Sequence, residues 1–169
     1  MSEQAGQTVI DSLEFARTGQ TLRGSLAVAA LTRLHDILYD SVGRVDFVVQ
    51  GGHDTRQRPT LSIEAKGRLH LRCQRCLGDL DFPLQVCNTV LLASPAKTVA
   101  GRLDDDGIEA IEPSAELDVE GLVEDEIILV LPYSPRHPEG VCRPSRSLAP
   151  GQDRETAFAT LAVLKRNRN

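Results

Sequence analysis

The chain has 169 residues, a length that fits one domain and allows a sizeable hydrophobic core. With no Trp, four Phe and two Tyr, that core must be aliphatic, and the composition argues against an RNA-recognition sheet, which stacks bases on exposed aromatic rings. The net charge of −5 is uneven, since residues 104–135 carry 11 acids and no Lys or Arg, whereas residues 136–169 carry 7 basic and 3 acidic side chains. The negative net charge therefore does not exclude an anionic partner, because the local field and not the net charge governs encounter.

The first part of the chain predicts a strand, a helix and a second strand. Residues 21–28 read as a strand, and leucines that recur at helical spacing predict a helix over 29–39. Alternating apolar side chains predict a strand over 44–50, and Gly51-Gly52 then begins a turn.

Residues 60–73 give the clearest strand, because apolar and polar side chains alternate there without a break. The Cys-Gln-Arg-Cys-Leu-Gly turn that follows reverses the chain into a second strand at about 79–92, whose apolar residues face the same core. Together the two strands predict a long antiparallel hairpin over residues 60–92.

Beyond the hairpin, residues 95–107 read as a loop and 108–113 as a short extended piece. A helix is predicted over 118–131, because Asp118 is suited to the N-cap, acids fill the first half and Pro132 ends the pattern.

The C-terminal part, residues 143–169, differs in composition. Residues 143–153, rich in Pro, Ser, Arg and Gly, predict a flexible linker, and 155–165 predict one short amphipathic helix. Residues 1–142 are expected to form a single α+β domain, an antiparallel sheet packed with two principal helices.

The N-terminus lacks the pattern of a signal peptide, and no apolar run approaches a membrane span. We therefore expect a cytoplasmic protein without a membrane partner. In that compartment the four cysteines, two of them spaced Cys-x-x-Cys, favour metal or redox use over a structural disulfide.

Cys73 and Cys76 can hold one zinc ion from a single turn, and a structural site needs two more ligands. His137 and Cys142 are spaced to converge from one loop, which makes these four residues the predicted ligand set. Cys87 is weaker, because it lies mid-strand on the polar side. Three alternatives stay open. The site has lost its metal, or the cysteines cap the hairpin as small apolar residues. In the third, they act as a redox pair, although the helix start that lowers a thiol pKa is missing.

A series of basic side chains lies along the predicted strand 60–73. Lys66, Arg68, His70 and Arg72 share one face at a spacing of about 6–7 Å, close to that of phosphates along one nucleic-acid strand, and Arg75 continues the series. Contacts from Lys66, Arg68, Arg72 and Arg75 would position RNA without reading its sequence. The alternatives are a solvated face that keeps the sheet soluble, and a face covered by the acidic segment 104–126.

The acidic segment 104–126 also suggests a basic protein partner, although a solvated helix face over a buried apolar stripe explains it equally. Catalysis on RNA is a third class of function. No Gly-rich phosphate loop, Ser elbow or His near the carboxylates supports it in the sequence.

Several motifs, taken together and in order, resemble the YceD family. They are Cys73-Gln74-Arg75-Cys76, the run Val123-Glu124-Asp125-Glu126-Ile127-Ile128-Leu129-Val130-Leu131-Pro132, Pro135-x-His137 with Cys142, and the closing Phe158-x-x-Leu161-x-x-Leu164-Lys165 pattern.

This resemblance implies a bacterial, cytoplasmic, non-enzymatic ribosome-biogenesis factor. It would be needed for synthesis, processing or stability of the large-subunit (23S) ribosomal RNA, with ribosomal RNA or a large-subunit precursor as its partner. Metal and nucleic-acid binding are expected properties of such a protein, in keeping with structural zinc at Cys73, Cys76, His137 and Cys142. In the alternative, an adaptor, segment 104–126 docks a basic ribosomal protein or a nuclease.

Overall fold

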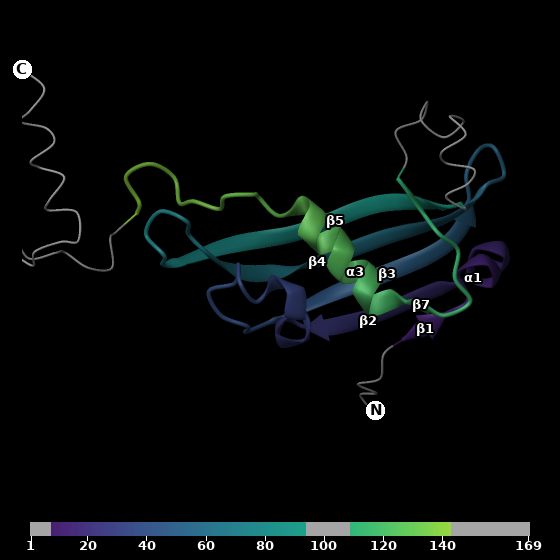
Figure 1. Cartoon of the computed structure of the whole chain (residues 1–169), viewed down its shortest axis with the longest axis horizontal. Coiled ribbons are helices and arrows are strands. Elements are labelled where there is room, and N and C mark those ends of the chain that lie inside the picture. Colours follow the sequence, from purple (N-terminus) through teal and green to yellow (C-terminus); the bar gives the residue numbers. More distant parts are fainter. Residues whose placement is uncertain (1–7, 94–108, 143–169) are drawn as a thin grey trace, which may run out of the picture.

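The computed structural model describes residues 8–93 and 109–142, which form the expected α+β fold (Figure 1). Its main element is a curled five-stranded sheet, antiparallel except for one short parallel edge. In sheet order the strands are β2 (Thr21–Ala27), β3 (Arg44–His53), β4 (Pro59–Arg72), β5 (Asp79–Leu92) and β6 (Ala110–Ile111). A small second sheet pairs β1 (Val9–Ile10) with β7 (Leu117–Asp118).

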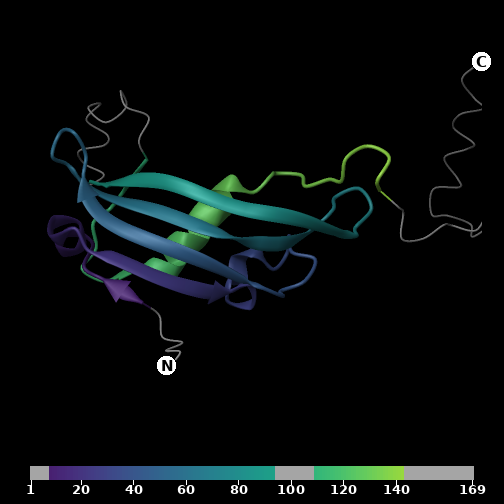
Figure 2. The same ribbon diagram turned by 180° about the vertical axis from the view of Figure 1, so that it is seen from behind.

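The predicted hairpin is confirmed as β4 and β5, two strands of 14 residues each. The alternation places Leu61, Ile63, Leu69 and Leu71 on the buried face of β4. Burying each such side chain stabilises the fold by about 1.5–3 kcal/mol. The opposite face of the sheet has no described element over it, as the view from behind shows (Figure 2).

Helix α3 (Val119–Val130) crosses the buried face of the sheet and confirms the predicted helix over 118–131 (Figure 1). The side chain of Asp118 caps it by accepting the Glu120 amide at 3.1 Å. Two of its acids point inward: Glu124 accepts from the Arg33 backbone amide and Nε, each at 2.9 Å, and Glu126 accepts from Asn88 of β5 at 2.9 Å. Burial raises the pKa of the Glu126 carboxyl, although Asn88 opposes the shift.

The helix predicted over 29–39 is wrong. The leucines at helical spacing are buried as expected, but the backbone forms two short 3-10 turns, Val28–Ala30 and Thr32–Leu34. The reason lies in β4, whose last residues extend past the end of β3 and need another partner. Tyr39 donates to the His70 carbonyl at 2.7 Å and Arg72 to the Ile37 carbonyl at 2.8 Å, so the segment ends as a strand neighbour rather than a helix.

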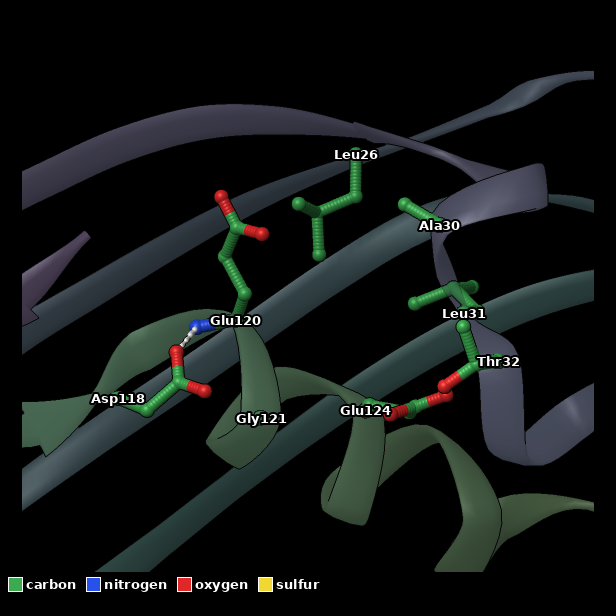
Figure 3. Close-up of a pocket in the computed structure, with 8 residues that line it drawn as sticks. All are labelled: Leu26, Ala30, Leu31, Thr32, Asp118, Glu120, Gly121 and Glu124. Carbon is green, nitrogen blue, oxygen red and sulfur yellow. Dashed lines mark hydrogen bonds between the residues drawn. The ribbon is translucent and has the colours of Figure 1, made fainter. Parts of the chain in front are cut away.

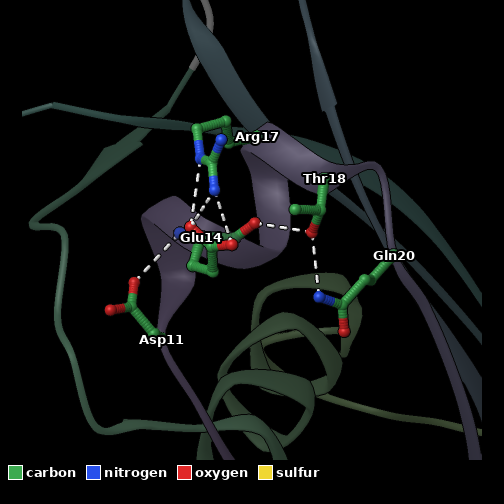
Figure 4. Close-up of polar contacts among 5 residues, drawn as sticks. All are labelled: Asp11, Glu14, Arg17, Thr18 and Gln20. Carbon is green, nitrogen blue, oxygen red and sulfur yellow. Dashed lines mark hydrogen bonds and ion pairs between the residues drawn. The ribbon is translucent and has the colours of Figure 1, made fainter.

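The second principal helix is instead α1 (Ser12–Thr18), which sequence periodicity did not reveal. Asp11 caps its start by accepting the Glu14 amide at 3.0 Å, and Thr18 donates to the Glu14 carbonyl at 2.7 Å (Figure 4). Gly19, at φ 63°, ends the helix.

α1 packs against β3 at a residue without a side chain. A Cβ on Gly51 would lie 2.7 Å from the Ala16 Cα and still closer to the Phe15 carbonyl oxygen, so the two backbones meet only because position 51 is Gly. The turn predicted at Gly51-Gly52 begins later, because both glycines belong to β3 and pair with Leu61 and Thr60 of β4.

The loop predicted over 95–107, the linker over 143–153 and the helix over 155–165 lie outside the described residues. The division of the chain at residue 142 therefore stays a prediction. Among the described residues, no helix is long and apolar enough to cross a membrane.

Candidate metal centre

The hairpin ends in a tight turn that brings two thiols to one side. Cys73 donates its amide to the Gly78 carbonyl at 3.0 Å, and Leu77 donates to the Cys73 carbonyl at 2.8 Å. Leu77 has a φ of 59°, a left-handed conformation that costs a non-glycine residue about 1–2 kcal/mol. The chain bears this strain at the turn that holds Cys73 and Cys76 together.

The second pair of candidate ligands comes from the segment that follows α3 and runs back to the hairpin tip. The Pro135 carbonyl accepts the Gln74 amide at 2.8 Å, which joins this segment to the turn. His137 donates its Nε2 proton to the Asp79 carbonyl at 2.7 Å. The same hydrogen bond leaves Nδ1 unprotonated in the neutral ring and directs it at the thiols.

Four donor atoms converge at this point, and all lie within 4.8 Å of one another. The Cys73 and Cys142 sulfurs are 3.6 Å apart. His137 Nδ1 lies 3.4 Å from the Cys76 sulfur and 3.5 Å from the Cys142 sulfur. The structure therefore brings together Cys73, Cys76, His137 and Cys142, which are adjacent only in pairs along the sequence.

These separations fit a tetrahedral zinc ion. Bond lengths of about 2.3 Å to sulfur and 2.0–2.1 Å to nitrogen require edges of about 3.8 Å between two sulfurs and about 3.6 Å between sulfur and nitrogen. The observed edges of 3.6 Å and 3.4–3.5 Å are close to both. Three soft thiolates and one imidazole suit zinc better than magnesium or calcium, and four protein ligands make a closed, structural type of site.

Hydrogen bonds favour the thiolate form of two of the cysteines. Burial would raise the pKa of Cys73, but amide donors from Cys76, His137 and Arg75 outweigh it and hold this pKa at about 5. The pKa of Cys142 is also lowered, because hydrogen bonds from Arg75 and His137 outweigh its burial. At Cys76, the Gly78 amide is outweighed by burial and by the neighbouring thiols, which raise the pKa. A metal arriving at neutral pH would thus meet Cys73 already as a thiolate, whereas Cys76 would release a proton on binding.

The fourth cysteine of the chain stands apart. Cys87 is exposed on β5, opposite Glu64 of β4, and does not belong to the cluster.

The structure places the basic residues predicted to contact RNA at two different sites. Lys66, Arg68 and Arg72 lie exposed on the open face of β4. Carboxylates from neighbouring strands lie among them: Arg68 pairs with Asp81 at 2.9 Å, and Asp46 is the register partner of Lys66.

The prediction of the basic face from sequence did not include these carboxylates. The position of two of them could have been predicted from the register of the hairpin. A six-residue turn after Arg72 places Asp79 opposite Arg72 and Asp81 opposite His70.

Arg75 lies apart from the other three, at the Cys-His cluster. Its Nε donates to the Cys142 sulfur at 3.1 Å, and its Nη2 donates to the His137 carbonyl at 3.0 Å. No sequence pattern indicated this interaction, which joins residues 67 positions apart.

A separate hollow of about 250 Å³ lies between the first turn of α3 and the 3-10 turns (Figure 3). Its lining is partly acidic, with Asp118, Glu120 and Glu124 beside Leu26 and Leu31. Glu124 already pairs with Arg33, and Asp118 serves as the helix cap, so Glu124 and Asp118 both have structural roles.

The family model for the large ribosomal RNA subunit accumulation protein YceD matches residues 61–165. The matched region contains β4 from Leu61 onward, β5, α3 and all four convergent ligands, and it covers more than half of the chain. The chain belongs to the YceD family. Membership implies a role in the accumulation of large-subunit ribosomal RNA, and YceD is a family of ribosome-biogenesis factors with no known catalytic activity. No solved structure matches the chain.

Proposed function

We propose that this YceD protein is a non-enzymatic ribosome-biogenesis factor that acts on large-subunit (23S) ribosomal RNA, with a structural zinc ion at its Cys-His centre. The convergence of Cys73, Cys76, His137 and Cys142 within the family-matched region carries the proposal. Zinc at these four residues would fasten the segment after α3 to the tip of the hairpin.

The open face of the sheet is the proposed RNA surface. Lys66, Arg68 and Arg72 stand along β4 with no described element over them. Phosphates would replace Asp81 as the partner of Arg68, since an exposed ion pair of this kind contributes only about 0.2–1 kcal/mol. Contacts from these three cations would reach the RNA backbone and position the RNA without reading its sequence.

A charge-reversal experiment tests this surface. Arg68→Glu together with Arg72→Glu should weaken binding to transcribed 23S RNA and reduce the slope of log affinity against log salt by about 0.7 for each single-strand phosphate that the variant no longer neutralises. The matched control reverses Arg17 and Arg136, two exposed arginines outside this surface. Equal affinity and slope in both double variants would refute direct RNA binding by this face.

A test in the cell addresses the family role itself. Deleting the gene should lower the ratio of large- to small-subunit ribosomal RNA, and the wild-type gene should restore it. The Cys73→Ser/Cys76→Ser variant should fail to restore the ratio if the centre is needed, whereas Cys87→Ser, the exposed cysteine outside the cluster, should restore it fully. A ratio that deletion leaves unchanged would refute the role for this chain.

A protein-interaction adaptor is the second candidate, and one observation favours it. Leu129, Val130 and Tyr133, at and just after the end of α3, are apolar and exposed. Together with the acids of segment 104–126, they would suit a basic ribosomal protein or a nuclease. Capture of such a partner that survives ribonuclease and is abolished in Leu129→Ser/Tyr133→Ser would favour the adaptor over direct RNA binding.

A further inference from the structure

We propose that Arg75 is a positioning residue of the Cys-His centre, which holds Cys142 against the other three ligands and slows the loss of the metal. This inference rests on the zinc site proposed above. It gives Arg75 a role different from that of Lys66, Arg68 and Arg72.

Cys142 lies in a loop with little backbone support. Cys73 is fully buried at the end of β4, and His137 is fixed through the Asp79 carbonyl. The loop from Pro138 to Cys142, by contrast, has one backbone hydrogen bond among the described residues. In it, the Val141 amide donates to the Pro138 carbonyl at 3.3 Å. Gly140, at φ 80°, allows this loop its turn but does not stiffen it.

The Arg75 guanidinium supplies the missing support. Nε donates to the Cys142 sulfur at 3.1 Å, while Nη2 donates to the carbonyls of His137 and Pro138 at 3.0 and 3.3 Å. One rigid, planar group thus links the Cys-x-x-Cys turn to both ends of the loop that carries the fourth ligand. A lysine in its place could offer a point charge but not this fork of donors.

Charge gives this interaction a second effect. Three thiolates around a divalent zinc ion leave a net charge of −1, and the guanidinium donates a hydrogen bond to one of them. An N–H donor on a thiolate sulfur stabilises its negative charge and reduces its reactivity toward electrophiles.

A hollow lies beside the centre. It measures about 290 Å³ and is lined by Arg75, Cys76, Gly140 and Cys142. Cys73 and His137 do not line it. A chelator or an alkylating reagent could therefore approach the centre through this hollow, beside Arg75. Of the two thiols that line it, Cys142 is the less buried.

The test uses full-length, zinc-loaded protein in four forms: wild type, Arg75→Met, Arg75→Lys and the control Arg68→Met. Zinc transfer to a chromogenic chelator gives the rate of metal loss, and mass spectrometry after iodoacetamide gives the order in which the thiols react. Arg75→Met should lose zinc at least about tenfold faster, as expected for loss of a charge-assisted hydrogen bond, with Cys142 modified first. Arg75→Lys should fall between it and wild type, and Arg68→Met should match wild type.

Equal zinc loss and an unchanged order of alkylation in Arg75→Met would overturn the proposal. So would weaker RNA binding by Arg75→Met at an unchanged zinc-loss rate, because Arg75 would then belong with the RNA-facing residues. Failure of wild type to bind zinc would refute the metal site proposed above. Hydrogen exchange of residues 137–142 in metal-free protein then decides the role of Arg75: faster exchange in Arg75→Met supports the link, and equal exchange overturns it.

Discussion

Single residues of β5 change the chemistry of the basic face of β4. His70 Nδ1 lies 3.0 Å from one Asp79 carboxylate oxygen and 3.2 Å from the other. This hydrogen bond raises the pKa of the His70 imidazole above its ordinary value of 6.5, because it favours the charged ring more than partial burial disfavours it. His70 therefore carries more positive charge near neutral pH than a free histidine does.

We expect the pKa of His70, followed by NMR, to lie above 6.5 and to fall toward that value in Asp79→Asn. That substitution keeps the Asp79 backbone carbonyl, which holds His137. Because the folded-state pKa is raised, the stabilisation by this pair is fully present below pH 6.5 and is lost as the pH rises through the folded-state pKa. The difference in unfolding free energy between wild type and His70→Gln should follow this course, and a difference independent of pH would contradict the assignment.

At the scale of elements, the packing of α1 against β3 depends on Gly51. The substitution Gly51→Ala should destabilise the protein by about 1–3 kcal/mol, because the new methyl group meets the backbone of Phe15 and Ala16 and the helix must move. Urea unfolding provides the measurement. The neighbouring Gly52→Ala is a matched control, since the nearest atom to its Cβ would be the Thr60 hydroxyl at 3.8 Å. Equal stability of the two variants would show that α1 is not held at this point.

The same elements show how far the sequence could predict the fold. β4 and β5 were predictable because their alternation is a local signal along two 14-residue strands. The segment 29–39 was not, because its leucine spacing suits a helix, whereas its backbone is decided by the unpaired end of β4. α1 has seven residues, too few for a periodic pattern, and is marked only by its caps.

The candidate site was predictable to a similar degree. Cys-x-x-Cys and the His137–Cys142 spacing each give a local pair, and four ligands from two pairs suffice for zinc. The contact of Arg75 with Cys142 was not predictable, because Arg75 follows Arg72 closely in the sequence and reads as another member of the basic series. This contact forms only because the chain returns from α3 to the hairpin tip.

For the whole molecule, the hydrophobic core and the Cys-His centre lie in separate places. The core cluster lies between the sheet, α1 and α3, whereas the centre joins the hairpin tip to the segment beyond α3. We expect a strong chelator to lower the melting temperature of zinc-loaded protein and to speed hydrogen exchange in residues 134–142, while β4 amides near Ile63 stay protected. Collapse of β4 protection on chelation would show instead that the metal holds the entire fold.

The 61 positions that separate Cys76 from His137 have a consequence for the order of folding. In an unfolded chain, closing a loop of that length costs about 4 kcal/mol of entropy, so an ion there can be held by the Cys73–Cys76 pair but rarely by all four ligands. Once β4, β5 and α3 have assembled, the loop is already closed and the remaining ligands arrive without that cost. Tight capture of an ion would therefore come late, and the fraction of chains that retain it would measure how many have finished folding.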